Sequence, residues 1–220
     1  MRCIKILASV FLAIPIFTTA QSKTAIEQYH VVGNNRTYTP IAIAHYQNNK
    51  KWYAEGRYNY EEQNTFSLYI GKTFSKKKKL SYGVTPLIGG AIGNFNGIST
   101  GMNMDLDYRN FFFSSQSQYS FSTEQTLDNF FYNWSELAYQ PLGWIYGGVS
   151  IQHTRLNKSQ NSFEKGILVG FSFGNFTLPV YIFDPLNKTR YFIVGLSLEW
   201  ERQGKKISAK NNPVNLSATY

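Results

Sequence analysis

The sequence predicts an all-β fold, an antiparallel up-and-down barrel of about twelve strands that crosses a membrane. Three observations lead to this prediction. The chain opens with an export signal, an apolar residue recurs at every second position along most of its length, and the residues between are polar but seldom charged. If two weaker strands near the N-terminus are left out, the same pattern gives ten strands.

The export signal occupies the first 20 residues. Arg2 and Lys5 make the start of the chain positive, residues 6–17 are almost wholly apolar, and residues 18–20 are small enough for cleavage. The apolar segment is shorter than the ~20 residues that a membrane-spanning helix needs. We therefore expect a cleaved signal peptide rather than an uncleaved anchor, and a mature chain that begins near Gln21.

Composition fits an exported, strand-rich chain. The one cysteine, Cys3, lies in the signal, so the mature chain has no disulfide and no thiolate ligand. Charged residues make up 16% of the chain, below the ~25% of ordinary soluble domains. The net charge of +9 falls to +7 (9 − 2) without the two cations of the signal. Part of the excess lies at residues 76–79 and in residues 201–220, a polar tail expected to be disordered. Because these residues form a turn and a tail rather than one stripe, no nucleic-acid partner is expected.

Two-residue alternation defines the strands of the predicted barrel domain, residues 21–200. Phe192, Val194 and Leu196 are apolar in the clearest strand, and Gly195 and Ser197 stand between them. Alternation of this length indicates a strand with two different faces. The predicted strands are 25–32, 40–47, 52–60, 65–74, 80–91, 98–108, 111–121, 129–140, 144–154, 163–173, 176–183 and 191–200.

The second face distinguishes a membrane barrel from a soluble one. It is rich in Gly, Ser, Thr, Asn and Gln, which suits a polar lumen better than a solvent-exposed surface. Aromatic residues recur at strand ends, as in the girdles of membrane barrels. Alternation alone leaves one alternative open, a soluble periplasmic ligand-binding barrel with its apolar face inward.

The last predicted strand resembles the recognition strand that ends bacterial outer-membrane β-barrels. Such strands carry a glycine, a hydrophobic residue three positions on and an aromatic residue two beyond, a spacing matched by Gly195, Leu198 and Trp200. Ile193 departs from the usual polar residue, and the chain continues for 20 residues beyond Trp200. The resemblance implies an outer-membrane protein that contacts outer-membrane lipids and is inserted by the barrel assembly machinery.

Connection lengths indicate the orientation of the barrel. If the last strand ends in the periplasm at Trp200, the shortest links, 109–110 and 174–175, are periplasmic turns, as expected for outer-membrane barrels. The lysine turn 76–79 then also faces the periplasm, where we expect it to lie against anionic lipid headgroups. The predicted outer loops are 33–38, 61–64, 93–97, 122–128, 155–162 and 184–188.

No motif identifies catalytic residues, a metal site or a cofactor, so the predicted function is a structural barrel or a small or plugged pore. Charges on the polar face are expected to point into the lumen, where they either pair or line a water path. Asp105 and Asp107 share one strand face with Arg109 nearby, which favours ion pairing over metal binding. The predicted lumen-facing charges are Glu55, Arg57, Asp105, Asp107, Arg109, Glu136 and Glu199.

A barrel enzyme that hydrolyses or acyl-modifies outer-leaflet lipid is the alternative from a different functional class. A hydrolytic enzyme needs a base near the rim, and histidine is the usual candidate. His153 lies close to a predicted outer loop, but it shares the apolar parity of its strand. That position favours a rim residue at the lipid headgroups. The solute and the oligomeric state are left open by the sequence.

Overall fold

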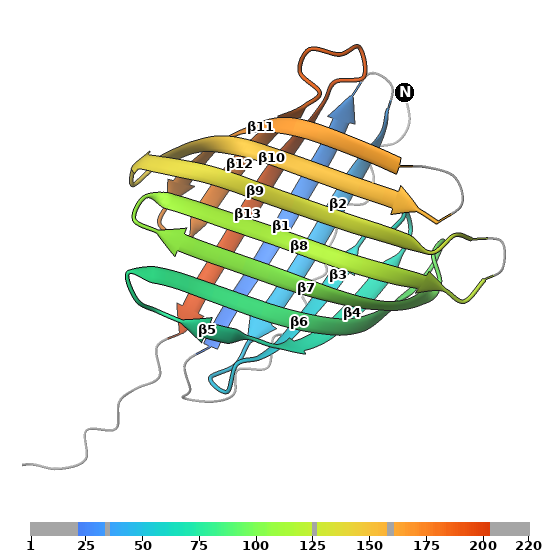
Figure 1. The fold of residues 1–220 in the computed structure, drawn as a ribbon, viewed down its shortest axis with the longest axis horizontal. Coiled ribbons are helices and arrows are strands. Elements are labelled where there is room, and N and C mark those ends of the chain that lie inside the picture. The colour runs from blue at the N-terminus through green and yellow to red at the C-terminus, as the bar shows by residue number, and fades with distance from the viewer. Residues whose placement is uncertain (1–21, 34–35, 125–126, 158–160, 203–220) are drawn as a thin grey trace, which may run out of the picture.

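The computed structural model describes residues 22–33, 36–124, 127–157 and 161–202. Every regular element within these ranges is a β-strand (Figure 1). None of the described residues forms a helix long and apolar enough to cross a membrane. The predicted signal peptide and all but the first two residues of the predicted tail lie outside these ranges, so both stay predictions.

Within the described residues, thirteen strand segments form one closed sheet. Each pairs antiparallel with its neighbours, and the pairings β1–β13 and β4–β6 close the ring. The short β5 follows β4 and pairs with the same partner, β6, so the thirteen segments make a barrel of twelve strands. The predicted antiparallel barrel of twelve strands is confirmed, and the alternative of ten is wrong. The segments are β1 (Ser22–Gly33), β2 (Arg36–Gln47), β3 (Trp52–Tyr58), β4 (Phe66–Lys72), β5 (Phe74–Lys76), β6 (Leu80–Ile92), β7 (Gly97–Tyr108), β8 (Phe111–Ser122), β9 (Phe130–Leu142), β10 (Ile145–Leu156), β11 (Asn161–Phe173), β12 (Phe176–Phe183) and β13 (Tyr191–Arg202).

Closure depends on the two chain-terminal strands. β1 and β13 pair over their whole length, from Ser22 opposite Arg202 to Gly33 opposite Tyr191. A barrel without a free edge leaves no row of unpaired backbone groups, which is a requirement for a sheet within lipid. The two strands that the sequence pattern defined least clearly, β1 and β2, are therefore integral parts of the ring.

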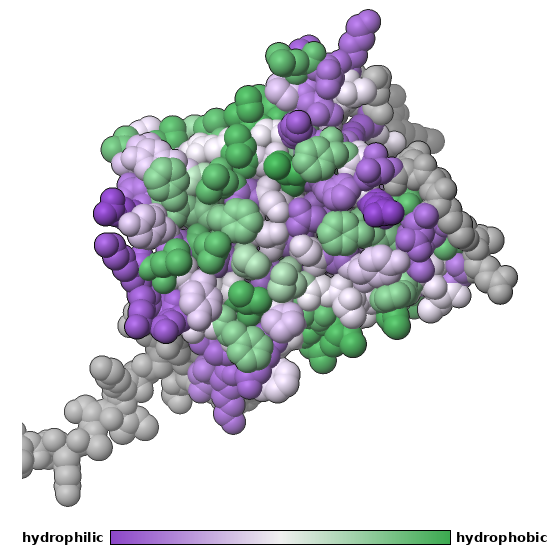
Figure 2. All heavy atoms as spheres, viewed as in Figure 1, coloured by the Kyte–Doolittle hydropathy of each residue, from purple (hydrophilic) through white to green (hydrophobic). Residues whose placement is uncertain are grey.

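Apolar side chains point away from the lumen. In β4, Phe66, Leu68 and Ile70 are each more than half exposed, whereas Ser67 and Tyr69 between them are buried. Figure 2 shows apolar side chains spread over the front strands of the barrel, with hydrophilic residues concentrated near its rims. This is the face expected to contact lipid, and it is the opposite of the inward apolar face that a soluble barrel requires.

Aromatic rings fill one side of the lumen. The Trp134 ring lies 5.6 Å from that of Tyr29 and 5.3 Å from that of Tyr181, measured between centroids. Inward glycines make room for such rings: a Cβ at Gly170 would lie 2.0 Å from the ring of Tyr146. Several glycines of the polar face therefore serve to seat aromatic side chains.

The links between strands gather at two rims. The turn rim holds links 48–51, 77–79, 109–110, 143–144 and 174–175, together with the start of β1 at Ser22 and the end of β13 at Arg202. The opposite ends of the strands form the loop rim, and at one link there the strands run further than predicted, because Arg36 already pairs with Gly33. At another, β3 ends two residues early, because Asn59 adopts a left-handed φ of 59°. The chain therefore leaves the sheet before Tyr60 and forms a loop over residues 59–65.

Candidate functional site

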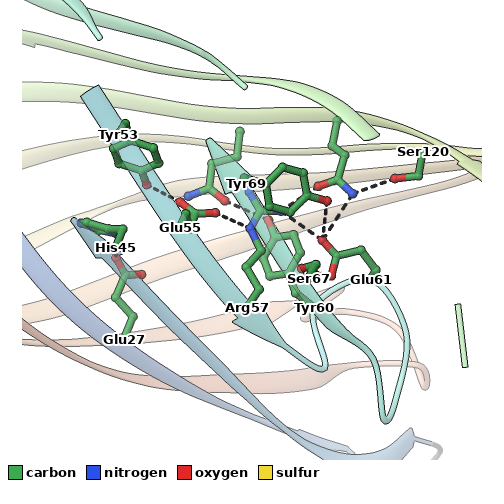
Figure 3. A network of polar contacts seen from close by, with 12 residues as sticks. Glu27, His45, Tyr53, Glu55, Arg57, Tyr60, Glu61, Ser67, Tyr69 and Ser120 are labelled. Atoms are coloured by element: carbon green, nitrogen blue, oxygen red, sulfur yellow. Dashed lines mark hydrogen bonds and ion pairs between the residues drawn. The ribbon is translucent and has the colours of Figure 1, made fainter. Parts of the chain in front are cut away.

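Buried charge lies inside the barrel near the loop-rim end of β3. Alternation turns Tyr53, Glu55 and Arg57 inward, and the side chains of Glu55 and Arg57 are each only 3% exposed. Arg57 Nε donates a hydrogen bond to Glu55, and the hydroxyl of Tyr53 donates another to the same carboxylate (Figure 3). The pair satisfies the general condition for charge inside a protein, because each ion has an opposite partner and further hydrogen bonds.

Arg57 also reaches across part of the lumen. Its Nη1 donates to Gln118 Oε1 at 2.7 Å, and Gln118 belongs to β8, which is not a sheet neighbour of β3. The guanidinium lies over the rings of Tyr60 and Tyr69, at 4.3 and 4.4 Å from their centroids. Cation–π contacts of this kind strengthen when water is excluded. One arginine thus joins two separate parts of the barrel wall.

Loop 59–65 places a second carboxylate against this arginine. The Glu61 side chain is fully buried, with Oε1 3.4 Å from Arg57 Nη1. Tyr69 donates its hydroxyl to Glu61 Oε1 at 2.9 Å, and Ser67 donates to Oε2 at 2.7 Å. The amide of Gln118 completes the set at 3.4 Å from Oε1. Glu61 is therefore held from several sides although it comes from a loop (Figure 3).

Tyr60 extends the contacts to the opposite wall. Its hydroxyl donates to Gln116 Oε1 at 2.8 Å, and its ring meets that of Tyr132 edge-on at 5.5 Å. Tyr132 lies on β9, several strands away from β3. We call the set Glu55, Arg57, Tyr60, Glu61 and Gln118 the constriction. It connects β3 with β8 and β9 through the interior of the barrel.

Between the constriction and the loop rim the lumen is packed. Phe95, from the link between β6 and β7, is 5% exposed and lies 5.1 Å from the ring of Phe130. The backbone N–H of Phe95 donates to Thr65 Oγ1 at 3.1 Å. Ser99 and Ser120, both buried, share a hydrogen bond of 2.8 Å. These buried side chains narrow this part of the lumen.

Between the constriction and the turn rim lies a cavity of about 340 Å3. Besides Glu55, two of its carboxylates have basic neighbours: Glu199 pairs with Lys23 at 2.9 Å, and Glu27 lies 3.8 Å from His45 Nδ1. Neither Asp105 nor Glu136 forms an ion pair with a described residue. Aromatic side chains complete the wall. The acidic and basic residues that line this cavity are Lys23, Glu27, His45, Glu55, Asp105, Glu136 and Glu199, so carboxylates outnumber basic groups.

The structure brings together most of the charges proposed from the sequence. Four of them line the cavity: Glu55, Asp105, Glu136 and Glu199. Arg57 lies at the end of the cavity that is nearer the loop rim. Asp107 and Arg109 do not line it and instead line a second pocket at the turn rim.

Arg109 corrects the expectation of a lumen-facing cation. It occupies the turn between β7 and β8 with a left-handed φ of 56°, and its guanidinium lies 5.3 Å from the Tyr108 ring centroid. Among the described residues there is no ion pair between Arg109 and either Asp105 or Asp107. Strand parity could not be extended to Arg109, because the two-residue turn reverses the chain at that position.

Sequence reasoning missed several residues of the site. Glu27 and His45 lie on β1 and β2, where alternation is weak. Each lies two residues beyond a buried residue, Ala25 or Ile43, and therefore on the same inward face, which is the signal that could have identified them. Glu61 carries no such signal, because it lies in a loop whose inward fold depends on contacts with distant strands.

The remaining candidates lie on the outside or at the end of the barrel. His153 sits between the rings of Phe131 and Phe163 and shares a 2.7 Å hydrogen bond with Asn161. In the strand that resembles a recognition strand, Trp200 is 40% exposed and Gly195 is buried. No described residues form a group of three or more His, Cys, Asp or Glu side chains suited to a metal ion.

The chain forms a closed antiparallel β-barrel with an apolar outer face and a partly polar lumen. Comparison of the sequence with known protein families and with curated proteins finds no match. Solved structures do match. The KdgM porin superposes with a TM-score of 0.57 at 9% identity, over 79% of this chain and 98% of that chain. The NanC porin gives 0.54 at 7% identity, over 79% and 97%. A second KdgM structure, in complex with disordered oligogalacturonate, gives 0.59 at 9% identity, again over 79% of this chain and 98% of that one. At these identities the likeness concerns the fold, which is that of outer-membrane porins.

Proposed function

We propose that the protein is a narrow outer-membrane pore that is closed in the described conformation. One observation carries the proposal: the constriction around Arg57 spans the lumen on the loop-rim side of a charged cavity. Barrels of eight strands are just filled by their side chains, whereas larger ones leave interior space. Here the interior space is the cavity between the constriction and the turn rim, and the polar side chains of the constriction separate it from the loop rim.

The nature of the closing groups favours a gate over a solid core. Two of the five constriction residues, Tyr60 and Glu61, come from a loop rather than from the barrel wall. The cavity volume of about 340 Å3 falls within the range of roughly 300–1,000 Å3 typical of small-molecule sites. A purely structural barrel has no need for such a cavity, and we therefore rank the pore above the structural role.

The charge of the cavity indicates which ions pass. Glu27, Asp105 and Glu136 face the same space, and His45 Nδ1 lies 3.8 Å from Glu27. Rings of carboxylates favour cations in narrow pores. Small cations are therefore the proposed permeant species, in contrast to the oligogalacturonate of the KdgM complex.

Orientation and partners follow as parts of the same proposal. The loop rim faces the exterior and the turn rim the periplasm, because short turns are periplasmic in outer-membrane barrels. Outer-membrane lipids surround the apolar outer face, and the assembly machinery recognises the strand with Gly195, Leu198 and Trp200. No catalytic step is included, because His153, on which the enzyme alternative rested, lies among outward aromatic rings.

Planar-bilayer recording of the purified mature protein tests the proposal. We expect small single-channel currents with wild type and larger ones with Gln118→Ala, which removes the side chain that bridges β8 to Arg57. The matched control is Gln28→Ala, a glutamine on the exposed face of β1, which should leave the current unchanged. If wild type and Gln118→Ala both fail to conduct, the protein is a structural barrel and the pore proposal is wrong.

A further inference from the structure

The donors that surround Glu61 form a built carboxylate site inside the lumen. We call the set Arg57, Ser67, Tyr69 and Gln118 the carboxylate site. Both oxygens of Glu61 are bound there: Oε2 by Ser67 at 2.7 Å, and Oε1 by Tyr69 at 2.9 Å with Arg57 and Gln118 at 3.4 Å. Glu61, the carboxylate that occupies the site, comes from a loop and is the acceptor of these bonds, whereas all four donors are side chains of the barrel wall.

The carboxylate site exists independently of the loop. Its four side chains come from β3, β4 and β8, and each is at most 4% exposed. Two of them have partners that do not depend on Glu61: Arg57 donates to Glu55, and Gln118 donates to Ser120 at 2.7 Å. If Glu61 left, these donors would remain in position around a space that accepts a carboxylate.

Loop 59–65 is constructed so that its middle can move without disturbing the barrel. Its base is closed by Asn59, whose N–H donates to Thr65 O at 2.9 Å and whose Oδ1 accepts from Asn64 N at 2.7 Å. Asn59 and Asn64 both adopt left-handed φ values, 59° and 53°, which turn the chain sharply at the two ends of the segment 60–63. That segment belongs to no strand, so its withdrawal costs no ladder hydrogen bond.

We propose that a small solute carboxylate replaces Glu61 in the carboxylate site and thereby opens the constriction. The inference rests on the proposed pore. Replacement of one carboxylate by another leaves the charge beside Arg57 unchanged, so no buried ion loses its partner. Withdrawal of Glu61 also removes Tyr60 from the lumen, because the two residues are adjacent in the loop.

The geometry selects a carboxylate over other anions. The site offers one guanidinium, shared with Glu55, and neutral donors from a serine, a tyrosine and an amide. Two oxygens held on separate donors suit a planar carboxylate, whereas a chloride ion cannot contact Ser67 and Tyr69 in the same way. Because the tethered Glu61 competes at an effective concentration of about millimolar or above, the solute must also be present at about that level.

Recordings in potassium chloride and potassium acetate at equal potassium concentration test the proposal. With potassium as the current carrier, acetate on the loop-rim side should raise the open fraction of wild type and saturate at millimolar levels. Glu61→Gln, which loses the charge-assisted bonds, should raise the open fraction by about tenfold or more in chloride and abolish the acetate response. Glu61→Ala serves as a second variant with the site vacated and should behave in the same way. Glu62→Gln makes the same chemical change at the next residue, which is exposed, and should match wild type.

The outcomes separate the two proposals. If Glu61→Gln and Glu61→Ala open the pore while wild type responds equally to acetate and chloride, the loop is a gate but the site takes no free carboxylate, and this inference is wrong. If an acetate response persists in both Glu61 variants, the ligand acts elsewhere and the inference is equally overturned. If Gln118→Ala conducts while the Glu61 variants stay closed, the pore stands and the gating role of Glu61 fails.

Discussion

Replacing Arg57 with methionine should lower the free energy of unfolding by about 3 kcal/mol or more. The side chain is 3% exposed and interacts with Glu55, Glu61 and Gln118. Methionine retains part of the bulk but supplies no charge and no donor. Two carboxylates would then face each other inside the barrel without a cation between them.

The magnitude follows from these contacts. Removal of one partner of a buried ion pair costs about 3–5 kcal/mol, because the other charge stays buried and unpaired. Loss of the contacts with Tyr60 and Tyr69 adds to this, since each cation–π interaction contributes roughly 0.5–2 kcal/mol. The double variant Arg57→Met with Glu55→Gln should recover at least about 1 kcal/mol, because it removes one of the stranded charges.

Urea unfolding in lipid vesicles, followed by tryptophan fluorescence, measures the effect. The matched control is Arg109→Met, an exposed arginine in a turn, which should stay within about 0.5 kcal/mol of wild type. A change below about 1 kcal/mol for Arg57→Met, with an unchanged denaturant slope, would refute the view that Arg57 compensates buried carboxylates.

Three further predictions concern other parts of the barrel. Glu136→Gln should lower the permeability ratio of potassium to chloride, measured from the reversal potential in a salt gradient, and the control Glu62→Gln should leave it unchanged. An unchanged ratio in Glu136→Gln would argue against the cavity as the region that selects ions. Gly170→Ala should destabilise the barrel by about 1–3 kcal/mol, because the new Cβ overlaps the Tyr146 ring, and Gly143→Ala, with nothing within 4 Å, is the control. Replacing the lysines at 77–79 with glutamine should reduce the difference in unfolding free energy between anionic and zwitterionic vesicles, by roughly 1 kcal/mol per lysine at low salt. A difference equal to that of wild type would contradict a role of these lysines in lipid binding.

The barrel could be predicted because alternation is a local signal that twelve strands repeat. In β4 and in residues 191–196 of β13 the exposed residues are those of the apolar parity, since lipid demands apolar side chains at every second position. The signal weakens in β1 and β2, where Ala25, Glu27 and His45 share the inward face with apolar residues such as Ile43. Mixed inward faces arise where the lumen is partly packed with aromatic and aliphatic groups, which a simple polar-lumen rule does not anticipate.

The candidate site could be predicted only in part. Glu55 and Arg57 followed from parity, because a charge on the polar face of a strand has no place other than the lumen. Glu61 and Tyr60 lie beyond the end of β3, and their inward position depends on Ser67, Tyr69 and Gln116 of other strands. Strand periodicity contains no information about a loop that folds back into its own barrel.

This difference between wall and loop bears on how the pore is closed. Glu61 is held by Arg57 at 3.4 Å, a cation that it shares with Glu55, and by the neutral donors of Ser67, Tyr69 and Gln118. If the loop withdrew without a replacement, those buried donors would lose their acceptor, at a cost of about 1–3 kcal/mol for each unsatisfied group. The closed state is therefore favoured while the site has no other ligand, and an external carboxylate removes that penalty. A gate of this kind needs no large rearrangement of the strands, because the difference in free energy between its two states resides in one buried carboxylate position.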